Sequence, residues 1–263
     1  MGKVRRLETP HGRVYLYEGE EGPIFMPSVT TILASEPSKY LQDLEEKIGK
    51  EELSRIGQRA ASRGTAMHKF LENFMICLKN GGNADNCLLY TQKKTPQDLR
   101  EEGLYEDRIS YGRDLFYNFL HENTFDEIKK VVFTEKFLWS LKNLFAGTAD
   151  FGYEHTDGRR IIADFKSASG MRGEETLNKY KKQGAAYALA FEEVYRKRID
   201  EVQVWISHPE GLQIETLVGD EMEKKKKEFI ELSKDFHAQW DVKPYEDYYH
   251  SQKMTENESK SNT

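Results

Sequence analysis

Apolar and polar positions follow two different periods along the chain. Up to about residue 125, the long segments repeat every three or four residues, which is typical of amphipathic helices. From about residue 130, three segments alternate or run apolar, which is typical of strands, and helical and strand-like segments follow in turn. The change of period predicts a helical first part and a second part that contains a sheet.

The first part is expected to form a small hairpin followed by helices. The expected strands cover 13–17 and 23–26, and the expected helices cover 29–34, 51–78 and 104–122. Ser28 can cap the first of these helices with its hydroxyl. Asn80-Gly81-Gly82-Asn83 interrupts the helical pattern, so a loop is expected from there to about Thr91.

The second part alternates strands with helices. Strands are expected over 130–139, 146–154, 159–165, 202–207 and 212–218, and helices over 174–198 and 221–240. A mixed sheet flanked by helices buries these faces best, so the fold class is α/β (α+β) with an N-terminal helical elaboration. The polar residues 251–263 are expected to form a disordered tail.

Composition narrows the class of protein only a little. Of the 263 residues, 32% are charged and 38% apolar, and the formal net charge is -6. No apolar run is long enough to cross a membrane, and Met1–Glu8 lacks the apolar region of a signal peptide. Only Cys77 and Cys87 are present, which excludes a disulfide scaffold and a four-cysteine zinc or iron–sulphur site. The expected location is a reducing cytoplasm, that of a bacterium or of the host of a phage.

Candidate chemistry lies on the central strands. Asp164 and Lys166 are two apart on one strand and therefore share a face, and a short hairpin would bring Asp150 beside them. Carboxylate oxygens suit Mg²⁺ or Mn²⁺, which can polarise a phosphoryl oxygen and lower the pKa of a bound water. Lys166 would position or deprotonate that water. An Asp-x-Lys taken alone is usually a surface salt bridge.

Further candidates lie on the helix after these strands. Gln183 and Tyr187 are four apart and point the same way, although a solvated amide and a core aromatic remain the simpler explanations. Lys181 and Lys182 precede them and favour contact with substrate. The lysines of 224–227 instead indicate a solvated helix face.

Together these motifs resemble those of the PD-(D/E)XK nucleases, and specifically of their RecB-like branch. The Gly64-x-x-x-His68 helix resembles the one in which that branch keeps a metal-binding histidine, and Pro27-Ser28-Val29-Thr30 is similar to an opening found in the mitochondrial genome maintenance exonuclease group. Glu135 matches the acid that precedes the catalytic hairpin of that group. The resemblance spans about residues 27–218.

The resemblance implies a role for each matched position. His68, Asp150, Asp164 and the backbone carbonyl of Phe165 would hold the metal, and Lys166 would be the catalytic lysine. Gln183 and Tyr187 would brace that lysine or contact the scissile strand, and Glu135 and Ser167 would lie on the substrate side with Lys181 and Lys182. A partly buried histidine satisfied by a neighbour remains the alternative for His68. Glu72 would either orient His68 or pair with Lys69.

The implied fold is a restriction-endonuclease-like core. One nuclease domain is expected over 1–250, with the helical elaboration over 27–125 and the catalytic core over 129–240. The implied function is a Mg²⁺- or Mn²⁺-dependent exonuclease that prefers single-stranded DNA or free ends, with no iron–sulphur cluster and no membrane partner. A structure- or sequence-specific endonuclease and a non-catalytic nucleic-acid-binding protein are the alternatives.

Overall fold

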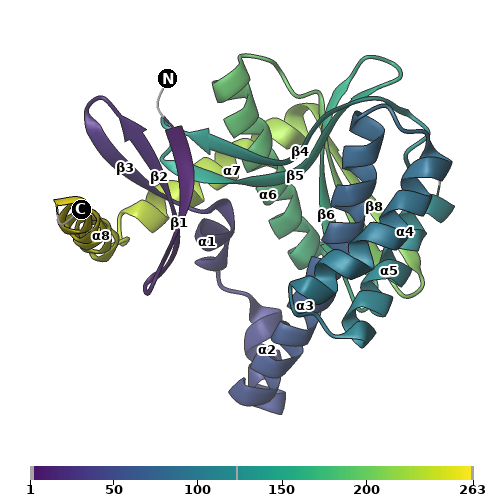
Figure 1. Cartoon of the computed structure of the whole chain (residues 1–263), viewed down its shortest axis with the longest axis horizontal. Coiled ribbons are helices and arrows are strands. Elements are labelled where there is room, and N and C mark those ends of the chain that lie inside the picture. The colour runs from purple at the N-terminus through teal and green to yellow at the C-terminus, as the bar shows by residue number, and fades with distance from the viewer. Residues whose placement is uncertain (1–2, 123, 262–263) are drawn as a thin grey trace.

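A five-stranded mixed sheet forms the centre of the molecule (Figure 1). The computed structural model describes residues 3–122 and 124–261. The sheet has the order β4 (Ile128–Ser140), β5 (Phe145–His155), β6 (Arg160–Ser167), β7 (Glu201–His208), β8 (Gly211–Val218). Only β6 and β7 run parallel, because α6 (Glu174–Tyr195) crosses over between them. The predicted mixed sheet flanked by helices is confirmed.

Helices cover both faces of this sheet. On one face α6 packs with α7 (Gly219–His237) and α1 (Val29–Ala34). The other face carries α3 (Lys50–Lys79), α4 (Ala84–Glu101) and α5 (Glu106–His121). Within 3–122 and 124–261, none of the helices combines the length and the apolar character needed to cross a membrane.

A second, three-stranded antiparallel sheet lies beside the first. It consists of β1 (Lys3–Thr9), β2 (Gly12–Gly19) and β3 (Gly22–Pro27), and α8 (Lys243–Ser261) packs against it. The predicted hairpin is confirmed, and β1 extends it. Residues 251–261, which were expected to form a disordered tail, continue α8, while 262–263 lie outside the described residues.

Two helices occupy segments without a predicted helix. α4 covers most of the expected loop, because the Asn83 side chain accepts a hydrogen bond from the Asn86 amide at 2.9 Å and caps the new helix. A disulfide between Cys77 and Cys87 joins the end of α3 to α4. α2 (Lys39–Ile48) begins at Ser38, which caps it in the same way.

The crossing of α3 and α5 leaves no room at Gly112. A Cβ atom there would lie 2.4 Å from the Cβ of Ala66 and 2.8 Å from the backbone nitrogen of Met67. Gly112→Ala is therefore expected to lower the free energy of unfolding by about 1–3 kcal/mol in urea denaturation. Gly57→Ala is the matched control, because a Cβ on that α3 glycine meets nothing within 4 Å. The control is expected to gain about 0.5–1 kcal/mol from helix propensity, and equal effects would contradict the packing argument.

Candidate active site

The site forms where β5 and β6 separate. Their ladder pairs Phe151–Glu154 with Arg160–Ala163 and goes no further, although β6 stays paired with β7 as far as Ser167. Beyond the ladder, the Asp150 carboxylate takes the place of a backbone carbonyl and accepts the Phe165 amide hydrogen at 2.8 Å. The gap leaves room for side chains from several elements.

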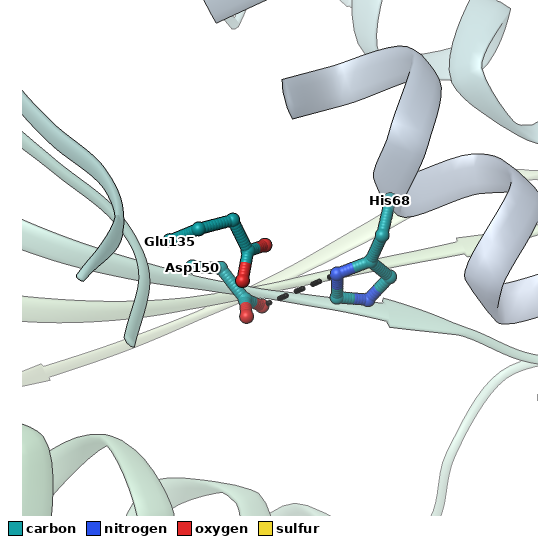
Figure 2. A group of neighbouring side chains, drawn as sticks. All are labelled: His68, Glu135 and Asp150. Carbon is teal, nitrogen blue, oxygen red and sulfur yellow. Dashed lines mark ion pairs between the residues drawn. The ribbon is translucent and has the colours of Figure 1, made fainter. Parts of the chain in front are cut away.

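Three side chains at this gap form a group that could hold a metal ion. His68 of α3, Glu135 of β4 and Asp150 of β5 each offer one ligand atom, and these atoms lie within 4.8 Å of one another. Figure 2 shows the His68 ring turned toward the two carboxylates, with its Nδ1 3.8 Å from Oδ2 of Asp150. One imidazole and two carboxylates fit a divalent cation such as Mn²⁺ or Mg²⁺.

Glu135 reaches this group from an unusual backbone position. Its φ angle of 45° lies in the left-handed region, which costs a residue other than glycine about 1–3 kcal/mol. The sequence resemblance had assigned Glu135 to the substrate side, whereas the structure places its carboxylate beside Asp150. Periodicity gave no signal for this placement, because it depends on a local break in the strand geometry.

Asp164 and Lys166 lie next to this group and form an ion pair. The Asp164 side chain is 1% exposed and also accepts a hydrogen bond from the Gln183 amide at 3.2 Å. The same amide lies 3.2 Å from the Tyr187 hydroxyl. Four of the predicted site residues are therefore brought together, and Asp164 contacts Lys166 and Gln183 rather than joining the three-residue group.

Comparison with known proteins identifies the family. The family model of the PD-(D/E)XK nuclease superfamily matches residues 33–254. The chain belongs to the PD-(D/E)XK nuclease superfamily. It is therefore a nuclease, a hydrolase that acts on nucleic acid, and nucleases of this superfamily use divalent metals.

Solved structures resemble the nuclease only distantly. The crystal structure of a putative exonuclease from Eubacterium rectale has 10% identity and a TM-score of 0.40, and the alignment covers 65% of this chain and 64% of that one. The structure of SSO0001 has 12% identity and a TM-score of 0.33, with 59% of this chain and 70% of that one covered. No curated protein matches the nuclease.

Burial shifts the pKa values of the nuclease's site residues. Burial, assisted by the Lys166 charge, lowers the pKa of His68 to about 4, so that its ring is neutral and free to act as a ligand at neutral pH. Burial and the Asp150 charge raise the pKa of Glu135 to about 8. Burial likewise raises the pKa of Asp164 to about 6. These carboxylates repel one another, and a bound cation would relieve that repulsion.

Lys166 stays charged in this environment. Burial opposes its protonation, but the charges of Asp164 and Asp150 outweigh burial and hold the pKa of Lys166 above its ordinary value. Its ammonium also lies over the Tyr180 ring, 5.2 Å from the centroid. The Phe165 backbone favours the protonated ring of His68 and so partly opposes the fall in its pKa.

Without metal, the nuclease is expected to lose stability as pH rises from about 6.5 to 8. The pKa of Glu135 is about 8 in the folded protein and 4.5 in its ordinary state, so the folded protein binds a proton here that the unfolded chain has released. Below pH 6.5 the lowered pKa of His68 makes stability rise with pH instead, because the unfolded chain binds a proton on this ring that the folded protein does not bind. Urea unfolding in EDTA at several pH values measures the slope of the free energy of unfolding against pH. Glu135→Gln is expected to flatten it, and the exposed Glu231→Gln is the control; an unchanged slope in Glu135→Gln would refute the assignment.

The two lysines predicted to contact substrate form ion pairs within the chain. Lys182 is buried and pairs with Glu36, so the prediction that it contacts nucleic acid is corrected: its charge ties α6 to the segment after α1. Lys181 pairs with Glu215 at 3.5 Å and with Glu221 at 3.4 Å. Sequence could not reveal these partners, because they lie far away along the chain.

Two smaller predictions also have an outcome in the structure. Ser167 follows Lys166 at the end of β6. A Cβ atom added to Gly64 of α3 would lie 3.0 Å from the hydroxyl oxygen of Ser167. The helix α3 thus passes close to the catalytic strand. Glu72 pairs with Lys69 at 3.2 Å, which is the second of its two expected roles.

Proposed function

We propose that this nuclease is a Mg²⁺- or Mn²⁺-dependent exonuclease that degrades single-stranded DNA. The observation that carries the proposal is the position of His68, Glu135 and Asp150 directly beside the Asp164–Lys166 ion pair. The motif resemblance to the RecB-like branch, and within it to the mitochondrial genome maintenance exonuclease group, supports the exonuclease assignment and the preference for single strands. It rests on Gly64-x-x-x-His68 and Gln183-x-x-x-Tyr187.

The residues of the site divide the work of phosphodiester hydrolysis. His68, Glu135 and Asp150 would hold a divalent cation, which when bound would polarise a phosphoryl oxygen and lower the pKa of a water. Lys166 is charged, so it orients the attacking water as a hydrogen-bond donor and stabilises the charge that develops on the phosphate. Asp164 pairs with that ammonium, and the Gln183 amide donates a hydrogen bond to the Asp164 carboxylate.

The cavity above the acids suits a polyanion. It measures about 240 Å³ and is lined by Glu135, Asp150, Gln183 and Tyr187 together with two arginines of the small sheet. These arginines are Arg6 of β1 and Arg13 of β2. Positive side chains beside the acidic group supply phosphate contacts despite the negative net charge of the chain.

The test is digestion of end-labelled linear single-stranded DNA, duplex DNA, circular single-stranded DNA and RNA, each with Mg²⁺, with Mn²⁺ and with EDTA. The expected result is rapid loss of linear single strands with either cation, slow digestion of duplex and RNA, intact circles and no cleavage in EDTA. Equal cutting of circles would overturn the exonuclease proposal in favour of an endonuclease. Binding without cleavage in both cations would indicate a non-catalytic nucleic-acid-binding protein.

A further inference from the structure

A second cavity lies beside the catalytic strand. It measures about 330 Å³ and lies between α2, α3 and the residues that follow β6. Ser167, the neighbour of Lys166, forms part of its wall, as do Ser169 and Arg172 further along the same connection. This cavity therefore adjoins the strand that carries Lys166.

The charged lining of this cavity is entirely positive. Arg59, Arg63 and Arg172 line it, and no aspartate or glutamate does. Among residues 3–122 and 124–261, none of these three arginines forms an ion pair, although the chain has more acids than bases. Positive charge that its own protein leaves unpaired is available for an anion.

In two of these arginines, one N–H donor has no hydrogen-bond acceptor. The Nε atoms of Arg63 and Arg172 are buried and have no hydrogen-bond partner in the described part of the chain. The Arg63 guanidinium lies over the Tyr111 ring, 4.2 Å from its centroid, which fixes its position. A buried N–H without an acceptor is unfavourable, and an anion that accepts a hydrogen bond from it would remove that cost.

The remaining wall is apolar and unusually exposed. Tyr40 and Leu41 of α2 are 59% and 49% exposed, and Ile56 of α3 is 43% exposed. α2 buries none of its side chains, so its apolar face is turned toward this cavity without being covered. An aromatic ring and aliphatic side chains beside arginines match the two parts of a nucleotide, a base with apolar faces and an anionic phosphate.

We propose that this cavity binds one unpaired nucleotide of the strand being cut, with its phosphate on Arg63 and Arg172 and its base against Tyr40. The inference rests on the proposed function, and it gives the preference for single strands a structural cause. A base that is paired and stacked within a duplex cannot enter the cavity without first leaving its partner. Entry requires no particular base, because every base has apolar faces.

The test measures binding alone, in EDTA, so that it does not depend on cleavage. Anisotropy of a fluorescein-labelled oligothymidylate is followed from low to high salt for the wild type, the double variant Arg63→Gln/Arg172→Gln and the control Arg160→Gln. The control removes an exposed arginine from the far end of β6. The double variant is expected to bind at least about tenfold more weakly, with a slope of log K against log salt smaller by about 0.7 for one lost phosphate contact. The control is expected to match the wild type.

A second variant separates the base from the phosphate. Tyr40→Ala is expected to weaken binding of oligothymidylate without changing the salt slope, and to leave binding of an abasic strand unchanged. Thermal unfolding confirms that each variant is folded. Equal affinity and equal salt slope in the double variant and wild type, or no binding of single strands by the wild type, would overturn the inference. Loss of cleavage with arginine-dependent binding intact would instead overturn only the proposed function.

Discussion

Replacing Lys166 by alanine is expected to lower kcat on linear single-stranded DNA by about 10³-fold. The ammonium pairs with Asp164 and also lies within the field of Asp150. Without it, neither the attacking water nor the developing phosphate charge has this partner. Strand binding is expected to change little, because the arginines of both cavities remain in place.

Single-turnover cleavage at saturating Mn²⁺ measures this effect. Lys129→Ala is the control, because that lysine is exposed and pairs with Glu154 at 2.7 Å on the sheet surface. Lys166→Met preserves more of the side-chain volume, and unfolding curves of both variants show whether the fold survives the loss of the buried ion pair. A folded variant that retains more than a tenth of the wild-type rate would remove Lys166 from the mechanism.

Replacing Asp150 by asparagine is expected to weaken Mn²⁺ binding by more than about 100-fold, since loss of groups that merely support metal ligands already costs about 10–100-fold. The substitution removes one negative charge from the group formed with His68 and Glu135. The asparagine oxygen can still accept the Phe165 amide hydrogen, so the separation of β5 and β6 is preserved. The defect should therefore appear in metal binding and not in folding.

Titration calorimetry of the metal-free protein with Mn²⁺ measures this affinity, and cleavage rates at increasing Mn²⁺ give a second estimate. Asp235→Asn, an exposed change on α7, is the control for charge. Rescue of cleavage at high Mn²⁺ would show that the carboxylate acts through the metal. Wild-type affinity in Asp150→Asn would exclude Asp150 from the metal site.

The central sheet was predictable from sequence because its strands carry their own signal. Alternation marked β4 to β8 to within a few residues. The helices that were not predicted are α2, which is only ten residues long, and α4. α2 buries no side chain. α4 begins after an asparagine, a residue that is found in turns as well as at the start of helices.

The site was predictable only where neighbours along the chain decide it. Asp164 and Lys166 share a face because they are two apart, and Gln183 lies near Tyr187 because they are four apart on a helix. The placement of Glu135 depends on a left-handed backbone, and that of Lys182 on an ion pair with Glu36, 146 residues away. Such features arise from tertiary packing, which no local period encodes.

At position 135, thermal stability and metal binding favour different residues. Glycine would adopt the left-handed backbone of this position with much less strain, and a neutral amide would avoid the charge repulsion that the Glu135 carboxylate meets beside Asp150. A laboratory selection for thermal survival alone would therefore favour replacing it, and the survivors would lose a candidate metal ligand. Engineering of this nuclease for robustness should hold position 135 fixed and seek its gains elsewhere.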